Sequence, residues 1–202
     1  MKIFQSTLFF QPVTGGQEVY VEKLAKTAIN IGESNVIQPR YGFKKSKLCL
    51  DGINILFINL PRGLSRINEL IPYFVFKFLL KFSYTNFLSK DDIIIYHYSS
   101  LYVKKFHPIN KSIVISHGRD WNEKSWSGKY KINSLLEAYK DGVRIVCNDL
   151  DVSNFIMQKM HEPVEITNTN NKHKNLIYLP NFYDSDLFVC PDKKNKNFIV
   201  MV

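Results

Sequence analysis

Cysteine is scarce in this sequence. Cys49, Cys147 and Cys190 are the only three in 202 residues. Their number is odd, they lie far apart, and no two have the spacing of a metal-binding or redox motif, which argues against a disulfide-rich or zinc-ribbon fold. A chain of this length can bury enough apolar surface to fold without such cross-links. We therefore expect a protein of the reducing cytoplasm.

The sequence also has no recognisable secretory signal and no uninterrupted hydrophobic span. The segment 1–7 has one positive charge, a broken apolar stretch and no small-residue cleavage site after it. The most apolar stretch, 70–88, is interrupted by Pro72, Lys77 and Lys81. A charged residue at the bilayer centre costs about 2.5–3.5 kcal/mol on insertion scales, so two lysines argue against a transmembrane helix.

Lys77 and Lys81 lie four residues apart and so share one face of the helix expected here. We favour a helix that packs on the protein core and keeps both lysines in water. The alternative is an interfacial helix that rests on an acidic membrane surface, which would make the protein peripheral on the inner face of a membrane.

Acidic residues are outnumbered, with 18 Asp and Glu against 27 Lys and Arg, for a net charge of +9. This excess favours an anionic partner, such as nucleic acid, an acidic membrane or a phosphorylated substrate. The densest basic groups, 44–47 and 193–196, have the length of ordinary solvated loops. Because no nucleic-acid-binding module is recognisable and the aromatic residues fall on apolar runs, we expect no nucleic-acid partner.

Short apolar runs alternate with helical patterns along the chain. Helices are predicted over 17–31, 66–88, 99–106, 129–140 and 149–160. Strands are predicted over 3–6, 35–38, 48–50, 53–60, 93–97, 113–117, 143–147 and 176–179, with Pro39 ending the second strand and Asp51-Gly52 turning a hairpin. This alternation predicts an α/β, Rossmann-like, doubly wound domain, with a mostly parallel sheet and helices on both faces.

Polar and small residues follow several of the predicted strands. The strand ends concerned are Ser6-Thr7, His97-Tyr98, His117-Gly118, Cys147-Asn148 and Pro180-Asn181. Ligands of open parallel sheets bind beyond the carboxyl ends of the strands. The sequence therefore predicts a polar crevice along this edge.

Gly15-Gly16 precedes the first predicted helix. Such a loop lets a ligand approach the backbone, and the helix N-terminus offers unpaired N–H groups, which suit a phosphate or a sugar hydroxyl. The alternative is a plain turn in which Glu18 satisfies the helix dipole. The Gly-x-Gly-x-x-Gly pattern and the Walker lysine are absent, which weakens dehydrogenase and P-loop interpretations.

The pentapeptide 117–121 directly follows a predicted strand. His117 could donate a hydrogen bond into the crevice, and Arg119 could pair with a phosphate or carboxylate. Asp120 could cap the next segment or pair with Arg119, and a purely structural role for His117 also stays open. His97, His107 and His117 are evenly spaced, but they fall on different elements without metal-ligand spacing, so we predict no metal site.

Five motifs occur in order: Thr14-Gly15-Gly16-Gln17-Glu18, Asp92-Ile93-Ile94-Ile95-Tyr96-His97, Ile115-Ser116-His117-Gly118-Arg119-Asp120-Trp121, Ile145-Val146-Cys147-Asn148, and Leu179-Pro180-Asn181-Phe182-Tyr183-Asp184 with Phe188 and Pro191 beyond. Together they resemble the N-terminal domain of nucleotide-sugar glycosyltransferases of family four, which have the GT-B fold. The resemblance runs nearly from end to end. Two positions depart from the pattern, Asn148 where serine is usual and Phe182 where glycine is common.

The resemblance implies one half of a two-domain enzyme. Residues 1–191 would form a Rossmann-like acceptor-side domain, and 192–202 would begin a C-terminal donor-binding domain, so this chain alone should be inactive. The implied reaction is retaining transfer, of hexosyltransferase type, from a nucleoside-diphosphate sugar to a glycan or lipid-linked acceptor, as in polysaccharide biosynthesis. No metal or other cofactor is implied. The alternative is a non-catalytic glycan- or membrane-binding module that acts with a partner subunit.

The resemblance and the strand-end positions together give a set of candidate site residues. His117 is the catalytic candidate, beside the transferred sugar. Asn181 would shape the turn toward the hinge. The candidates for substrate contacts are Gly15, Gly16, His97, Arg119, Asp120 and Asn148.

Overall fold

The computed structural model describes residues 1–10, 15–42, 47–66, 70–118, 122–161 and 175–179. Its strands are β1 (Lys2–Ser6), β2 (Glu33–Tyr41), β3 (Lys47–Leu50), β4 (Ile53–Leu60), β5 (Ile93–Tyr96), β6 (Ser112–Ser116), β7 (Arg144–Cys147) and β8 (Leu176–Tyr178). Its helices are α1 (Gly16–Ile29), α2 (Leu70–Phe87), α3 (Trp126–Lys140) and α4 (Leu150–Met160). Short 3₁₀ turns lie at η1 (Arg62–Arg66), η2 (Ser99–Leu101) and η3 (Ile109–Lys111).

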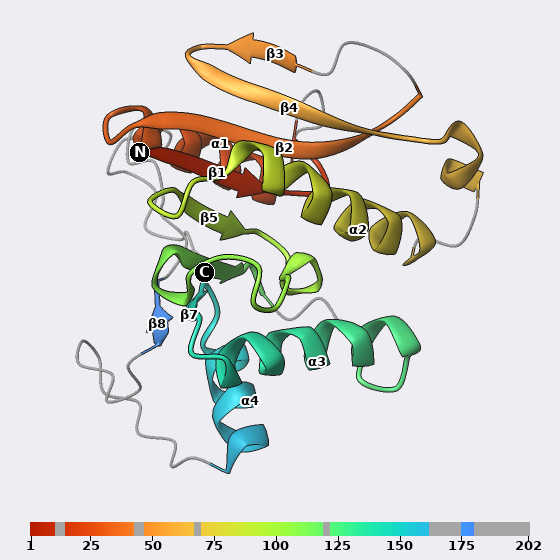
Figure 1. The fold of residues 1–202 in the computed structure, drawn as a ribbon. Coiled ribbons are helices and arrows are strands. Elements are labelled where there is room, and N and C mark those ends of the chain that lie inside the picture. The colour runs from red at the N-terminus through yellow and green to blue at the C-terminus, as the bar shows by residue number, and fades with distance from the viewer. Residues whose placement is uncertain (11–14, 43–46, 67–69, 119–121, 162–174, 180–202) are drawn as a thin grey trace, which may run out of the picture.

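The strands form one sheet in the order β3-β4-β2-β1-β5-β6-β7-β8 (Figure 1). All neighbours are parallel except β3 and β4. The chain winds outward from β1 to β4, crosses back, and winds outward again from β5. This doubly wound order confirms the predicted fold class and puts the topological switch point between β1 and β5.

Helices cover both faces of the sheet, as predicted. α1 packs on one face, where Ile3, Ile95 and Ile115 form a core cluster with α1 residues. The other face carries α2, α3 and α4, whose apolar sides join a larger cluster with Phe4 and Ile94. Because successive strand residues point to opposite faces, the central strands β1, β5, β6 and β7 contribute to both layers.

The strand that contains Pro39 is longer than predicted. The prediction that Pro39 ends this strand is wrong, because β2 continues through Pro39 to Tyr41. β2 pairs with β1 only as far as Ile37 and with β4 alone beyond that point. Beyond Ile37 β2 pairs only with β4, so the missing N–H of Pro39 breaks no ladder bond on the open side.

Two local predictions had opposite outcomes. Asp51 and Gly52 both have positive φ, 48° and 80°, as a type I′ turn requires, which confirms the β3–β4 hairpin. The helix predicted over 99–106 is reduced to η2. Tyr102 follows η2 in an extended conformation, and its hydroxyl donates to Asp141 on α3 at 2.8 Å. This tertiary contact draws the chain out of a helical path.

The apolar stretch tested for a membrane span is α2. Its buried side, with Phe76, Leu80 and Tyr84, packs on the core, as the favoured interpretation requires of this side. Lys81 is exposed as expected, whereas Lys77 is half-buried and its Nζ lies 3.1 Å from the hydroxyl of Tyr130 on α3. Within the ranges that the structure describes, no helix has both the length and the apolarity to cross a bilayer.

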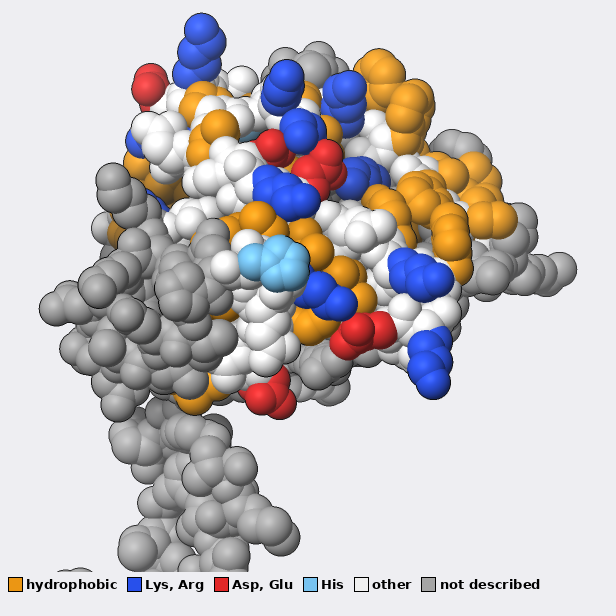
Figure 2. Space-filling view, turned by 90° about the horizontal axis from the view of Figure 1, so that it is seen from below, with side chains coloured by type: hydrophobic (Ala, Val, Ile, Leu, Met, Phe, Trp, Pro, Cys, Tyr) orange, Lys and Arg blue, Asp and Glu red, His pale blue; other side chains and the backbone are white. Residues whose placement is uncertain are grey.

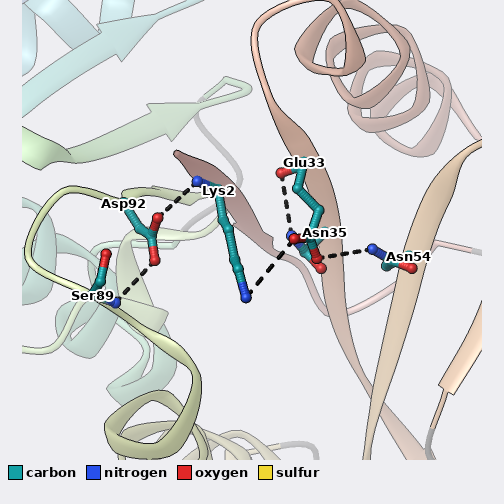
Figure 3. Close-up of polar contacts among 6 residues, drawn as sticks. All are labelled: Lys2, Glu33, Asn35, Asn54, Ser89 and Asp92. Atoms are coloured by element: carbon teal, nitrogen blue, oxygen red, sulfur yellow. Dashed lines mark hydrogen bonds and ion pairs between the residues drawn. The ribbon is translucent and has the colours of Figure 1, made fainter.

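The amino-terminal edge of the sheet is held by a buried carboxylate, Asp92 (Figure 3). Its two oxygens accept hydrogen bonds from the backbone N–H groups of Lys2, at 2.7 Å, and Ser89, at 2.9 Å. Burial raises the pKa of this carboxyl, but the two N–H donors outweigh burial and hold the pKa below its usual value. Asp92 therefore ties β1 to the start of β5, on the edge opposite the predicted crevice.

Replacing Asp92 with asparagine should lower the free energy of unfolding by about 2 kcal/mol, because one oxygen that accepts an N–H becomes a donor. Urea unfolding at pH 7 measures this loss. The carboxylate stabilises the fold above the usual aspartate pKa and loses its effect as the pH falls below that value, so the difference should shrink at pH 3. Asp91→Asn, at the exposed neighbouring position, is the matched control. Equal stability of the Asp92 and Asp91 variants would contradict this role.

Candidate functional site

The carboxyl ends of β1, β5, β6 and β7 meet at the switch point, and polar residues continue the ladder beyond them. The backbone N–H of His97 donates to the carbonyl of Ser6 at 3.0 Å. In the same way, the N–H of Asn148 donates to the carbonyl of Ser116 at 3.0 Å. The residues that follow β5 and β7 are thus held against the last residues of β1 and β6, on one edge of the sheet.

A chain of side-chain contacts crosses this edge. Gln5 Oε1 lies 2.9 Å from His97 Nε2. His97 Nδ1 lies 3.0 Å from His117 Nε2, and the two rings are stacked. His117 Nδ1 lies 3.3 Å from Asn148 Nδ2. One hydrogen-bonded row therefore joins Gln5 on β1 to Asn148 after β7.

The row has a defined direction. Because the carbonyl oxygen of Gln5 can only accept, His97 Nε2 carries a proton and donates to it. A neutral His97 then accepts at Nδ1 from the Nε2–H of His117. His117 in turn accepts at Nδ1 from the amide of Asn148. Each ring holds one proton in this arrangement, and the outermost acceptor is Nδ1 of His117, which is only half-buried.

The inner histidine is sealed in the fold. His97 is 1% exposed. Burial, and after it the neighbouring His117, holds the pKa of His97 well below 6.5, so this ring is neutral. His97 Nδ1 lies on His117, which separates the ring from the half-exposed end of the row. The direct substrate contact expected of His97 from the sequence stays a prediction.

The first turns of α1 cover the same residues. The ring of Tyr20 meets that of His117 edge-on at 4.9 Å between centroids. The amide of Gln17 donates to the backbone carbonyl of His97 at 3.2 Å. Burial raises the pKa of Tyr20, although a hydrogen bond with Asn148 opposes the shift. The N-terminus of α1 is thereby fixed beside the imidazole pair.

The two glycines at this helix start are not required by the backbone. Gly15, the N-cap residue, has an extended conformation with φ of −150°. Glycine has no side chain, so it makes no side-chain capping hydrogen bond to the helix. Gly16 is the first residue of α1, and a Cβ there would meet no described heavy atom within 4 Å beyond its chain neighbours and the helix's own backbone. A Cβ on Gly15 would lie 2.5 Å from Oε2 of Glu18, the far end of a flexible side chain that can shift, so neither position needs glycine for its backbone conformation.

Most of the predicted site residues come together here. Gly15, Gly16, His97, His117 and Asn148 lie on this one edge, as expected for a crevice. Arg119, Asp120 and Asn181 lie outside the described residues, as do 180–202, which include the predicted start of a second domain. The sequence-based prediction missed Gln5, Gln17 and Tyr20. Gln5, a polar residue within an apolar strand, was the one available signal.

The third of the evenly spaced histidines lies elsewhere. His107 Nε2 is 2.7 Å from the backbone carbonyl of Asp92, at the opposite edge of the sheet. In the portion of the chain that the structure describes, no group of three or more His, Cys, Asp or Glu side chains is placed to hold a metal ion.

Solved structures resemble this fold over about half of their length. A trehalose-6-phosphate synthase has a TM-score of 0.64 at 13% identity, and the match covers 93% of this chain and 50% of the synthase. The chain has the fold of one half of a GT-B glycosyltransferase. An E. coli trehalose-6-phosphate structure bound with UDP-2-fluoro glucose matches at 0.59 and 13% identity, over 89% of this chain and 48% of that one.

A third match is the α,α-trehalose-phosphate synthase (UDP-forming) from Burkholderia xenovorans in complex with glucose-6-phosphate. Its TM-score is 0.54 at 12% identity, over 79% of this chain and 43% of the synthase. No protein-family model matches the chain. No curated protein matches it either. These similarities show that the chain has the fold of a GT-B half. They do not distinguish family four from other GT-B families.

Proposed function

We propose that this chain is the acceptor-side half of a retaining glycosyltransferase that takes a sugar from a nucleoside diphosphate. The observation that supports this most is the row Gln5–His97–His117–Asn148, which lies at the switch point under the open N-terminus of α1. The GT-B fold of the half supports it as well. On this proposal the donor-binding half begins near residue 192. The five motifs in order also lead us to place the enzyme in glycosyltransferase family four.

The proposed mechanism depends on positioning and charge. Breaking the bond between sugar and diphosphate gives an oxocarbenium-like transition state, with negative charge growing on the departing phosphate. The N–H groups at the start of α1 would face that charge, and Gly15 and Gly16 leave room for it. His117 would face the transferred sugar. A sugar hydroxyl that replaced Asn148 at Nδ1 would donate to His117, whereas the sequence had suggested His117 as the donor.

The remaining assignments follow the sequence motifs. Arg119 and Asp120 would contact the acceptor, Asn148 would support His117, and Asn181 would shape the hinge. The acceptor would be a glycan or a lipid-linked sugar, and the reaction would use no metal. UDP-2-fluoro glucose and glucose-6-phosphate, which two of the similar structures hold, make UDP-sugars and sugar phosphates the first compounds to test.

The test is transfer of labelled sugar by the complete gene product, with a panel of nucleoside-diphosphate sugars and sugar acceptors. Transfer with retained anomeric configuration would support the proposal. If the protein binds these compounds yet transfers no sugar, the second candidate is favoured, a glycan-binding module that depends on a partner subunit. Inversion of configuration would overturn the retaining assignment.

Gly16→Ala should leave the fold intact and weaken donor binding. Alanine at the first position of a helix should cost no stability, since glycine is the poorer helix former by up to about 1 kcal/mol. The added methyl would occupy the space where we place the phosphate, and we expect roughly tenfold weaker binding, which corresponds to about 1.4 kcal/mol. Calorimetric titration with a nucleoside-diphosphate sugar measures this. Gly63→Ala in η1, where a Cβ also meets no described neighbour, should bind normally; equal binding by both variants would contradict the phosphate position.

A further inference from the structure

The outer side of α2 exposes a row of large apolar side chains. Ile71, Phe74, Phe78 and Phe82 lie along this side, and Phe78 is 61% exposed. Trp126, the first residue of α3, is 62% exposed and lies beside them, with its ring centroid 5.7 Å from that of Phe74. We name these five residues the aromatic strip. Figure 2 shows hydrophobic side chains gathered along one side of the molecule, with basic side chains next to them.

Ring contacts give the strip a continuous surface across two helices. Phe78 and Phe82 are 4.8 Å apart between centroids, and Phe74 lies 4.8 Å from Tyr130 on α3. A shallow groove of about 540 Å³ runs between these rings, and its floor includes Val75 and Val103. From Ile71 to Phe82 the helix advances roughly 17 Å at 1.5 Å per residue. The strip is therefore long, narrow and apolar.

The charged residues that line the groove are both basic. Lys77 and Lys81 line the groove. The Nζ of Lys77 lies 3.1 Å from the hydroxyl of Tyr130 and 5.4 Å from the centre of its ring, so the ammonium sits at the polar end of an aromatic side chain. Lys124 and Lys129, which precede and follow Trp126 in the sequence, are both exposed. α2 itself contains no Asp or Glu.

We propose that the aromatic strip rests on an anionic lipid bilayer. A helix that lies in a membrane interface buries aromatic side chains at the boundary of headgroups and acyl chains, while lysines extend their charged ends to lipid phosphates. The strip offers this arrangement in three turns of α2 and at the start of α3. A net charge of +9 adds attraction to an acidic surface.

Other occupants of the strip fit less well. A second copy that met this face about a two-fold axis would bring the lysines of each α2 toward those of the other, with no carboxylate on α2 to pair with them. The centre of a protein interface is depleted in lysine, whereas Lys77 and Lys81 lie within this groove.

The strip begins at the same edge of the sheet as the proposed site. α2 follows the carboxyl end of β4, through η1, and α3 follows the carboxyl end of β6, so Ile71, Phe74 and Trp126 are at the crevice edge of the sheet. If the proposed function holds, this placement makes the acceptor a lipid-linked sugar, whose head would enter the crevice from the membrane surface.

Co-sedimentation of the complete gene product tests the membrane proposal. The vesicles are an equal mixture of phosphatidylglycerol and phosphatidylcholine, or phosphatidylcholine alone, at 50 mM and 500 mM salt. We expect binding to the anionic vesicles that weakens at high salt. The double variant Phe78→Ser/Phe82→Ser should bind at least tenfold more weakly. Lys81→Gln should bind about fivefold more weakly, the factor that corresponds to roughly 1 kcal/mol per basic residue near such a surface.

Matched controls come from elsewhere on the surface. Ile31→Ser removes a side chain that is 62% exposed, and Lys47→Gln removes an exposed lysine on β3; both should bind as the wild type does. Trp121→Phe leaves Trp126 as the only tryptophan within residues 1–202. The part of the emission that a further Trp126→Phe change removes should shift to the blue on anionic vesicles and be quenched by brominated lipid.

Three results would overturn the proposal: no binding of the wild type to anionic vesicles at low salt, unchanged binding of the double variant, or a defined protein complex that the double variant abolishes while vesicle binding persists. Sugar transfer to a water-soluble acceptor separates the two proposals. If transfer occurs without vesicle binding, the membrane proposal alone fails. If vesicles bind but no donor supports transfer, the proposed function alone fails.

Discussion

If the proposed function holds, His117→Ala should lower kcat of the complete gene product at least about 100-fold, the loss expected when one positioned polar group is removed from an active site. His117 is the outermost ring of the row, is half-buried, and has its Nδ1 3.3 Å from Nδ2 of Asn148. Alanine removes both the ring that would face the transferred sugar and the link between Asn148 and His97. Steady-state kinetics with the best donor and acceptor measure the effect.

The fold should survive this change, because His117 is only half-buried. Thermal unfolding followed by circular dichroism checks that point. His161→Asn, at the C-terminal end of α4, is the matched control and should keep wild-type kcat; its φ of 56° suits asparagine as well. Unchanged turnover in His117→Ala would remove His117 from the mechanism.

His97→Leu should lower the free energy of unfolding by roughly 2–3 kcal/mol, because it leaves the buried oxygen of Gln5 without its donor. It also removes an acid-sensitive element of stability. Since burial holds the pKa of folded His97 well below 6.5, the unfolded chain binds a proton more readily than the folded one. Stability contributed by the neutral ring is therefore complete above about pH 6.5 and falls by up to about 1.4 kcal/mol per pH unit below it.

Urea unfolding of wild type and His97→Leu between pH 8 and pH 5 separates these effects. The wild type should lose stability as the pH falls through 6.5, and the variant should lose less. His97→Gln can place an amide between Gln5 and His117, so it should recover part of the stability at pH 8 without recovering the pH slope. The same slope in wild type and His97→Leu would show that another group is responsible.

Much of the architecture was predictable because strands and helices alternate regularly along the chain in α/β folds. Apolar runs such as 93–97 and 113–117 mark strands buried on both faces, and they are β5 and β6 in the structure. Parallel strands place their carboxyl ends at the same edge. For that reason, the sequence alone predicts that residues that follow separate strands, such as His97, His117 and Asn148, lie close together.

What escaped the sequence-based prediction depends on tertiary contacts. Tyr20 reads as a core residue of α1, and only the packing of α1 on the sheet brings its ring to His117. Gln5 stands out as a polar residue in a strand, but its partner is 92 residues away. β2 can continue through Pro39 because it has only one neighbour there, and the order of strands in the sheet cannot be read from the sequence.

The most direct test of the central claim is a ligand titration of the isotopically labelled protein by NMR, with UDP-glucose and glucose 6-phosphate as the first probes. If the crevice is a sugar-nucleotide site, the largest shifts should appear at the amides of Gly15 and Gly16 and at the imidazole of His117, while Asp92 at the opposite edge stays unchanged. Saturable binding that perturbs residues away from these three, and leaves them unmoved, would contradict the account.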